Sequence, residues 1–384
     1  MTDLLDPLRS LKQSHWFKLI CGASMQHLSS VRSLTLAYAL AGADCIDVAA
    51  DPAVIAAAQE AIAVATNLSS ERARRGFGKN IQSPLLMVSL NDGEDPHFRK
   101  AEFNSTECPT DCSRPCERIC PAQAIVFNSI KYDLSGVVAQ KCYGCGRCIP
   151  VCPYGIIYTK SYVSTPGAIA PLILSNGVDA VEIHTNVGRL AEFQRLWQAI
   201  SPWVERLAVV AISCPDGDGI IEYLHALHDL IAPLPCALIW QTDGRPMSGD
   251  IGDGTTLAAV KLGQKVLAAQ LPGYVQLAGG TNGYTVAKLK AMGLLRKAEE
   301  PVSRGAGEKE GILSSAPLPP HPPASISGVA YGSYARLLLS PILEQLEAME
   351  VNQLVNVRLE DETELLWQAV KLADSLVSQL KSQQ

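Results

Sequence analysis

Two runs of cysteine lie close together in the chain and have the residue type and spacing to bind metal. The chain has 384 residues and 12 cysteines, eight of them between residues 108 and 152. The second run is Cys142, Cys145, Cys148 and Cys152-Pro153, with the spacing C-x2-C-x2-C-x3-C-P. In bacterial ferredoxins this spacing gives three thiolates to one iron-sulfur cluster and the fourth to another. The sequence therefore predicts iron-sulfur chemistry.

The first run has wider spacing but ends in the same way. Each run closes on Cys-Pro, and an isoleucine follows each proline by four residues, at Ile125 and Ile157. This pseudo-symmetry predicts two 4Fe-4S clusters that exchange their fourth ligands, although the C-x3-C spacing of the first run leaves a three-iron cluster open there. The predicted ligands are Cys108, Cys112, Cys116 and Cys152 for cluster 1, and Cys120, Cys142, Cys145 and Cys148 for cluster 2.

Zinc is the alternative metal for these cysteines. A structural zinc site usually takes two separated C-x2-C pairs and does not need the trailing Cys-Pro. Disulfides are the other use of clustered cysteines, but they are rare where cytosolic reductants keep thiols reduced. The N-terminal residues lack the pattern of a secretion signal, so we expect a cytoplasmic protein with reduced thiols.

Composition excludes several classes of partner. The chain is 47% hydrophobic and 18% charged, which is enough apolar material for a large core. Its net charge is -6 and it has no basic run, so neither nucleic acid nor an anionic membrane is an expected partner. No apolar stretch of about 18 residues is present to span a bilayer.

The rest of the chain alternates short apolar, β-branched runs with segments of helical periodicity. Such alternation is typical of repeated βα units. Eight strands predict a (β/α)8 TIM-like barrel, with a ferredoxin-like two-cluster insert after the third strand, at the face where barrel enzymes keep their sites. An open doubly wound sheet is the alternative. The expected strands are residues 17–23, 44–50, 85–90, 180–184, 207–213, 237–241, 274–278 and 327–332.

These patterns divide the chain into five parts. The Pro/Gly-rich segment near residue 310 has almost no core material and should form a surface loop or linker. The segment after the last strand has leucines at helical spacing, which predicts two C-terminal helices. The expected parts are 1–97 and 163–299 for the barrel, 98–162 for the insert, 300–325 for the loop, and 326–384 for the last strand and C-terminal helices.

Glycine-rich turns follow the seventh and eighth predicted strands. In many barrels the loops at these two places hold a phosphate, as in flavin-binding barrels. Tight turns and close helix packing are the structural alternative for the same glycines. The candidate contacts to the phosphate of a flavin such as FMN are Gly279, Gly280, Gly332 and Ser333.

Polar residues near other predicted strand ends could line a pocket at the barrel mouth. His184 has acid-base potential there, although a histidine with a structural hydrogen bond would give the same sequence pattern. The candidate lining residues are Asp47, Asp51, Glu182, His184, Asn186, Gln241, Asp243 and Arg245.

Four further cysteines lie in or beside apolar runs and have no C-x2-C partner. Free cysteine is among the residues most often buried, so we expect these thiols to be core residues. Cys214, at a strand end, is the one with an alternative role as a reactive thiol. The four are Cys21, Cys45, Cys214 and Cys236.

The double-cysteine insert, in an α/β chain of this size with GVAYGSYARLLLSPIL at residues 328–343, resembles the light-dependent period (LdpA) family of cyanobacteria and their chloroplast relatives. The resemblance covers the whole chain. It implies an iron-sulfur protein that reports cellular redox state, and thereby light intensity, to the circadian clock. It also implies the Kai oscillator complex and the circadian input kinase as partners.

Two other functions fit the residues. The chain could be an oxidoreductase in which the clusters pass electrons to a flavin at the glycine turns, with a substrate near His184 and Arg245. It could also be a cluster-bearing scaffold or assembly factor without turnover. The sequence leaves enzymatic activity undecided because no unambiguous catalytic acid, base or nucleotide motif is present.

Overall fold

The structure of the protein is a computed structural model that describes most of the chain. The statements below concern these residues only, and Cys145, Arg245 and almost all of the proline-rich segment lie outside them. The described residues are 7–22, 28–77, 82–93, 99–120, 123–129, 134–139, 141–142, 148–161, 173–244, 254–295, 325–353 and 357–381.

Eight parallel strands close into a barrel in the order β1-β12-β11-β10-β9-β8-β3-β2. Because β1 pairs with both β2 and β12, the sheet has no free edge, and the open doubly wound alternative is wrong. All eight predicted strands are confirmed, with ends shifted by a few residues. The strands are β1 Trp16–Gly22, β2 Cys45–Ala49, β3 Leu85–Asn91, β8 Ala180–His184, β9 Val209–Pro215, β10 Ala237–Asp243, β11 Tyr274–Ala278 and β12 Gly328–Tyr331.

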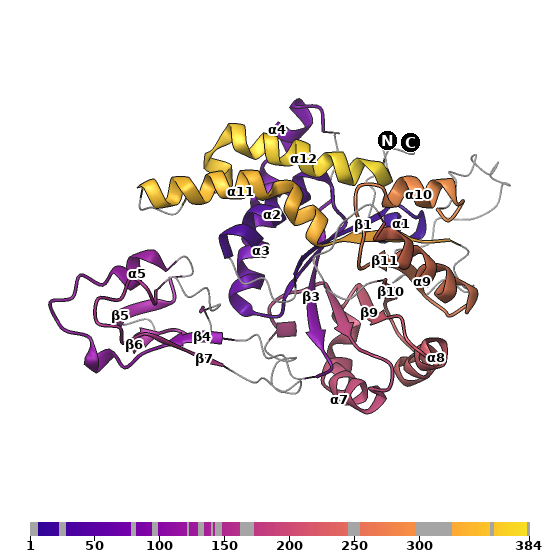
Figure 1. Cartoon of the computed structure of the whole chain (residues 1–384), viewed down its shortest axis with the longest axis horizontal. Coiled ribbons are helices and arrows are strands. Elements are labelled where there is room, and N and C mark those ends of the chain that lie inside the picture. The colour runs from indigo at the N-terminus through magenta and orange to yellow at the C-terminus, as the bar shows by residue number, and fades with distance from the viewer. Residues whose placement is uncertain are drawn as a thin grey trace, which may run out of the picture.

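Helices surround the barrel (Figure 1). The start of α3 follows the expected pattern, because Asp51 is its N-cap and accepts a hydrogen bond from the Ala53 N–H at 2.8 Å, with Pro52 in the first turn. The helices around the barrel are α1 Pro7–Lys12, α2 Leu28–Ala41, α3 Pro52–Asn67, α4 Ser69–Arg74, α7 Leu190–Ile200, α8 Ile220–Ile231, α9 Thr256–Ala268 and α10 Thr285–Ala291.

The two expected C-terminal helices are present as α11 Ser333–Gln353 and α12 Thr363–Lys381. Helix α12 packs against α2 and α11 and buries an apolar face that includes Trp367. Its last residue, Lys381, places Nζ 2.6 Å from Asp44 Oδ1, just before β2. The final helix is therefore tied to the barrel at the amino end of β2.

Residues 99–161, called here the cluster segment, lie between β3 and β8 and contain all eight predicted ligands, seven of them described. The segment forms two small antiparallel sheets, β4-β7 and β5-β6, and lies beside α3 (Figure 1). It has its own hydrophobic cluster, which includes Phe103 and Cys116. Its elements are β4 Arg99–Glu102, α5 Pro115–Ile119, β5 Ile125–Ser129, β6 Leu134–Val137 and β7 Tyr158–Ser161.

One ion pair joins the cluster segment to the rim of the barrel. Lys100 Nζ in β4 lies 3.8 Å from Asp51 Oδ2 at the start of α3. The Asp51 side chain is almost fully buried, and burial raises its pKa while Lys100 opposes that rise. The five-part division of the chain and the ferredoxin-like description of the insert remain predictions.

Side chains alternate across each barrel strand and divide the core in two. Phe17 and Leu19 of β1 face the outer core between strands and helices, whereas Trp16 faces the barrel interior. The part of the interior at the amino ends of the strands is apolar. It is filled by residues that include Trp16, Met87, Ile239 and Tyr274. The barrel is therefore plugged at the amino ends of its strands.

None of the helices in the described ranges is long and apolar enough to cross a membrane.

The contact between β12 and β1 generates the first testable prediction. A Cβ at Gly328 would lie 2.3 Å from the carbonyl oxygen of Trp16, so Gly328→Ala must displace backbone in the closing strand pair. We expect the free energy of unfolding to fall by about 1–3 kcal/mol, measured by denaturant unfolding. Gly254→Ala is the matched control, because nothing lies within 4 Å of its added Cβ. Equal stability of the two variants would contradict close packing at Gly328.

Candidate functional site

The predicted cluster ligands lie in and around the small core of the cluster segment. Cys116, Cys142 and Cys148 are buried in it, and Cys120 and Cys152 pack against it while partly exposed. The folded segment thus brings both cysteine runs into one hydrophobic cluster. Cys145, the eighth predicted ligand, lies outside the described residues.

The thiols predicted to bind cluster 1 interact with one another. Burial raises the pKa of Cys108, and Cys112 and Cys152 raise it further. The pKa of Cys116 is also raised, first by burial and then by the same neighbouring thiols. Cys152 therefore lies near the first run although it belongs to the second in sequence. This neighbourhood is what exchange of the fourth ligand requires.

Backbone N–H groups point at the sulfurs that end both runs. The Ala124 N–H donates to Cys120 Sγ at 3.2 Å. Burial would raise the pKa of Cys152, but the N–H groups of Tyr154, Ile156 and nearby residues outweigh burial and lower it. Ala124 and Ile156 each follow their cysteine by four residues. The pseudo-symmetry of the two Cys-Pro exits is therefore present in the backbone.

Two further N–H groups point at sulfurs of predicted ligands, from Ala101 to Cys142 Sγ at 3.3 Å and from Arg114 to Cys112 Sγ at 3.4 Å. Hydrogen bonds of this type stabilise thiolate and tune the potential of an iron-sulfur cluster. The sulfurs present thus fit an iron-sulfur group. Among the described residues, no three His, Cys, Asp or Glu side chains converge tightly enough to hold a single metal ion. The division into two sets of four remains a prediction.

A second candidate site is a ring of polar side chains inside the barrel. Each member lies two residues beyond an apolar residue of the plug, so the alternation of the strands points it into the interior. Seven of the eight strands contribute one buried member. They are Lys18, Asp47, Ser89, Glu182, Ser213, Gln241 and Gln276.

Lys18 is the centre of this ring. Its Nζ donates a short hydrogen bond to Glu182, lies 3.2 Å from Asp47 Oδ2 and donates to Gln241 Oε1 at 3.1 Å. Gln241 Nε2 in turn donates to Glu182 Oε1 at 2.6 Å. Lys18 and Glu182 are both 0% exposed. Burying such charges carries a large desolvation penalty, which makes the ring a candidate for function as well as structure.

His184 and Asp243 lie one level above the ring, toward the carboxyl ends of the strands. His184 Nε2 is 3.2 Å from Glu182 Oε1, and the side chain is 31% exposed. Burial lowers the pKa of His184, although the carboxylates of Asp243 and Asp47 oppose the shift. A neutral ring that donates from Nε2 leaves Nδ1 as an acceptor, so this end of the barrel can accept a hydrogen bond or a proton.

The expected lining of the mouth is correct for only part of its residues. Asp47, Glu182 and Gln241 belong to the ring, and His184 and Asp243 lie above it. Asp51 is used instead as the N-cap of α3, and Asn186 is an exposed residue whose carbonyl accepts from Arg189 N–H at 3.1 Å. Arg245 is not described.

Sequence reasoning missed Lys18, Ser89, Ser213 and Gln276. Each stands inside an apolar run that was interpreted as a buried strand, where a single polar residue draws little attention. The signal that could have found them is the period of two, because each shares a strand face with an apolar residue of the barrel plug.

The glycine turns have packing explanations. Gly279 and Gly280 adopt positive φ angles of 61° and 95°. The Gly280 carbonyl accepts from Thr255 Oγ1 at 2.7 Å, and an added Cβ would lie 2.9 Å from the Thr255 carbonyl oxygen. These contacts account for both glycines without a ligand, so their phosphate role remains a prediction.

Arg336 accompanies Gly332 and Ser333. It donates from Nη2 to Ser333 Oγ at 3.1 Å and from Nη1 to the Ile20 carbonyl oxygen at 3.1 Å. This places a guanidinium beside the start of α11. A cation at this position is compatible with a phosphate, but nothing in these contacts requires one.

The four isolated cysteines are buried, as predicted. Burial raises the pKa of Cys21, Cys214 and Cys236 to about 12, and that of Cys45 well above its usual value. Thiols that stay protonated are poor nucleophiles. Cys214 is therefore a core residue, and the alternative of a reactive thiol is not supported.

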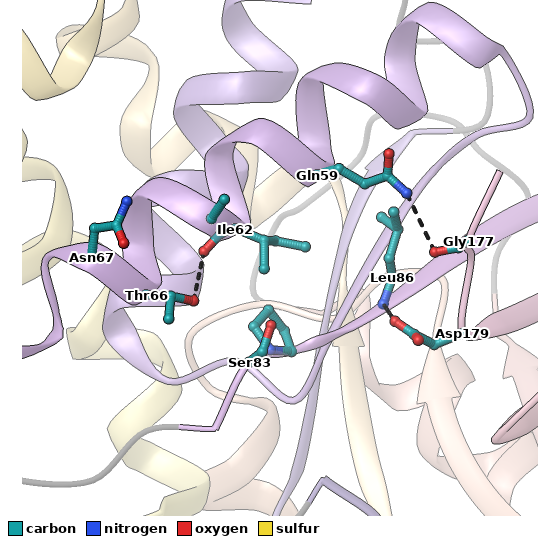
Figure 2. Close-up of a pocket in the computed structure, with 10 residues that line it drawn as sticks. Gln59, Ile62, Thr66, Asn67, Ser83, Leu86, Gly177 and Asp179 are labelled. Carbon is teal, nitrogen blue, oxygen red and sulfur yellow. Dashed lines mark hydrogen bonds between the residues drawn. The ribbon is translucent and has the colours of Figure 1, made fainter.

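A surface groove of about 430 Å³ lies beside the amino ends of β3 and β8, at the end of the barrel opposite His184 (Figure 2). Two of its polar side chains have backbone partners: Gln59 Nε2 donates to the Gly177 carbonyl oxygen at 3.3 Å, and Asp179 Oδ2 accepts from the Leu86 N–H at 2.9 Å. Asp179 is the one charged residue of the described lining, so no cluster of charged side chains faces the groove. We therefore assign the groove no function.

Two models of one protein family match the chain, and the second covers only the ring members from Glu182 onward. Residues 108–163 match the "LdpA Fe-S cluster-binding domain", and residues 172–379 match the "Light dependent period A C-terminal domain". "Light dependent period A" of Synechococcus elongatus is 45% identical over 375 residues, which are 98% of this chain and 94% of that protein. A probable iron-sulfur protein of the Frd operon of Proteus vulgaris is 32% identical over 106 residues, 28% of this chain and 61% of that protein.

The buried ion pairs of Lys18 generate the second testable prediction. Lys18→Met leaves the carboxylates of Asp47 and Glu182 buried without their cation, so we expect the free energy of unfolding to fall by about 3–5 kcal/mol. Adding Glu182→Gln should recover part of that loss, because it removes one uncompensated charge. Denaturant unfolding measures both effects.

Lys160→Met is the control, because Lys160 forms a surface pair with Glu102 at 3.5 Å. Its loss should cost about 1 kcal/mol or less. If Lys18→Met were no more destabilising than Lys160→Met, the barrel ring would not hold charge as described.

Proposed function

The chain belongs to the light dependent period A family, as its resemblance to that family predicted, and on that premise we propose that it is an iron-sulfur redox sensor that passes cellular redox state, and thereby light intensity, to the circadian clock. Family membership supports an iron-sulfur protein of light-dependent period control. The sensing step and its relay are our proposal.

The observation that carries the proposal is the group of thiols in the cluster segment. Cys108, Cys112, Cys116 and Cys152 would hold cluster 1, where neighbouring thiols and the amides near Cys152 support the grouping. Cluster 2 would be held by Cys120, Cys142, Cys145 and Cys148. We propose two 4Fe-4S clusters, with a three-iron cluster as the alternative at the first site because of its C-x3-C spacing.

An iron-sulfur cluster supplies a one-electron change of charge when it is bound. A shift of about 59 mV in a one-electron potential changes an equilibrium constant tenfold. Modest changes in reductant supply would therefore change the fraction of reduced protein substantially. A partner that binds one oxidation state more tightly than the other converts that fraction into a signal.

Clock proteins are the partners we propose, specifically the Kai oscillator complex and the circadian input kinase, with the cytoplasm as the compartment. Family resemblance is the support for both of these partners. The net charge of -6 is consistent with protein partners and gives no reason to expect nucleic acid.

A flavin-dependent oxidoreductase is the second candidate function. It is favoured by the polar ring around Lys18 and by the acceptor that His184 presents at the carboxyl ends of the strands. In this alternative an FMN would receive electrons from the cluster segment, with its phosphate near Gly279, Gly280, Gly332 and Ser333. A cluster-bearing scaffold without turnover is the third. An absorption spectrum of protein purified without oxygen separates the enzyme from the other two, since a stoichiometric flavin would favour the enzyme.

Ligand substitution gives the third testable prediction. Cys142→Ser removes a ligand of cluster 2, so anaerobically purified protein should lose about half of its iron and acid-labile sulfide. In cells, the clock period should respond less to light intensity. Iron analysis, electron paramagnetic resonance and period measurements at several light intensities check these outcomes.

Cys236→Ser is the matched control, because Cys236 is buried in the barrel core away from the cluster segment. It should keep its iron and its light-dependent period. Wild-type protein that folds without iron would refute the sensor and the reductase together. Loss of iron in Cys142→Ser with unchanged light dependence would refute the sensor alone.

A further inference from the structure

Lys100 of β4 contacts both the cluster segment and the barrel. Its Nζ donates a hydrogen bond to the carbonyl oxygen of Ala139 in the cluster segment, and it lies 3.8 Å from Asp51 Oδ2 at the start of α3 (Figure 1). The Lys100 side chain is 14% exposed and the Asp51 side chain is 1% exposed. This ion pair is therefore largely withdrawn from water, and charges withdrawn from water interact more strongly than charges at the surface.

On the barrel side, Lys100 compensates a carboxylate whose own partners are incomplete. Asp51 Oδ1 accepts from the Ala53 N–H at 2.8 Å and caps α3, but the buried Oδ2 accepts no hydrogen bond among the described residues. A buried carboxylate oxygen without a hydrogen bond is costly. Burial accordingly raises the pKa of Asp51, and the charge of Lys100 is the first influence that opposes the rise. The cap of a barrel helix thus depends on a cation that the cluster segment supplies.

On the other side, Lys100 lies near a thiol predicted to bind cluster 2. The N–H of the next residue, Ala101, donates to Cys142 Sγ at 3.3 Å. Ala139, which accepts from Lys100, lies in the turn that leads to Cys142. The Cys142 N–H closes that turn by donating to the Val138 carbonyl oxygen at 3.1 Å. Nζ of Lys100 and Sγ of Cys142 are at most about 12 Å apart, because only the lysine side chain, one peptide bond and that hydrogen bond separate them.

We propose that the Lys100–Asp51 ion pair couples the charge of cluster 2 to the amino end of α3 in the barrel, an inference that rests on the proposed function. On reduction, an external one-electron donor gives up one electron, cluster 2 gains one negative charge, and no bond in the protein forms or breaks. The Lys100 ammonium stabilises the added charge, and the Asp51 carboxylate opposes it.

The coupling acts in both directions, because a coupling free energy between two sites is reciprocal. By whatever factor the Asp51 carboxylate disfavours reduction, reduction disfavours that carboxylate by the same factor. The oxidation state of cluster 2 therefore changes the stability of the residue that caps α3. This provides a route by which a redox change in the cluster segment reaches the barrel.

Coulomb's law gives the size of the effect. With an effective dielectric of about 20 and about 10–15 Å between Lys100 and the cluster, the ammonium favours the reduced cluster about six- to seventeenfold. Asp51 lies farther away, at about 15–20 Å, and disfavours the reduced cluster about four- to sixfold. Converted at about 59 mV per decade, these factors are about 45–75 mV and about 35–45 mV.

The test measures the midpoint potentials of the clusters by a redox titration followed by electron paramagnetic resonance, on the full chain purified without oxygen. Lys100→Met should lower one midpoint potential by about 45–75 mV, and Asp51→Asn should raise the same potential by about 35–45 mV. Asparagine caps helices as well as aspartate does, so Asp51→Asn removes the charge and keeps the cap. Structural damage does not produce shifts of opposite sign from the two partners of one ion pair.

Three further variants separate charge from packing. Lys100→Arg keeps the cation and should change the equilibrium constant of reduction less than about twofold. Lys100→Met combined with Asp51→Asn should give a potential between those of the single variants, and it leaves no unpaired buried carboxylate if Lys100→Met alone does not fold. Lys160→Met is the matched control, because Lys160 lies opposite Lys100 in the register of β4 with β7 but is 58% exposed. Screening by water should limit its effect to less than about twofold.

Each result decides the inference. In protein that contains its iron, unchanged potentials in both Lys100→Met and Asp51→Asn would overturn it and leave the proposed function standing. A shift in Lys160→Met as large as that in Lys100→Met would also overturn it, since any positive charge on the sheet would then suffice. Equal shifts of both clusters would contradict the assignment to cluster 2. Protein without iron would refute the proposed function, and this inference with it.

Discussion

The alternation of side chains along eight parallel strands is the constraint on which the molecule depends. In a closed barrel every second side chain faces the interior and its neighbours face the helices. In β1 this places Trp16 and Lys18 inside while Phe17 and Leu19 pack against the helix layer. A shift of β1 by one residue in register would turn Lys18 into the outer apolar core. The same shift would turn Phe17 and Leu19 into the barrel interior. The same period therefore builds the core and aligns the buried charges.

The barrel accommodates the cluster segment because the alternation of side chains constrains the strands and not the segments that connect them. The register of β3 with β8, from Met87 opposite Ala180 to Asn91 opposite His184, is continuous although the whole segment lies between them in sequence. The segment has its own hydrophobic cluster, so the barrel core does not depend on cysteine chemistry. A polar contact joins the two parts, the Lys100–Asp51 ion pair at the rim of the barrel. Polar contacts respond to a change of charge more readily than an apolar interface does.

Local patterns in the sequence predicted the features that are encoded locally. Apolar, β-branched runs marked all eight barrel strands, and Asp51-Pro52 marked the start of α3. The two ligand sets drawn from the cysteine spacing stay a prediction, and the N–H groups at Cys120 and Cys152 are consistent with the symmetry inferred from the two Cys-Pro exits. The sequence could not reveal which strand residues meet. Lys18 and Glu182 are far apart in the chain, as are Arg32 and Glu360, and only barrel closure and the packing of α2 bring them together. The short strands of the cluster segment were missed because hydrophobic periodicity is weak over four or five residues.

The pairing of β1 with β12 sets an order on biosynthesis. Trp16 aligns with Gly328, so the two strands that seal the barrel lie far apart in the chain and are translated at widely separated times. While a ribosome is still making the residues between them, β1 and β11 have no β12 to pair with, and their unpaired backbone can engage other chains. Loading of iron into the cluster segment, which is made long before β12, can therefore begin on a nascent chain whose barrel is still open.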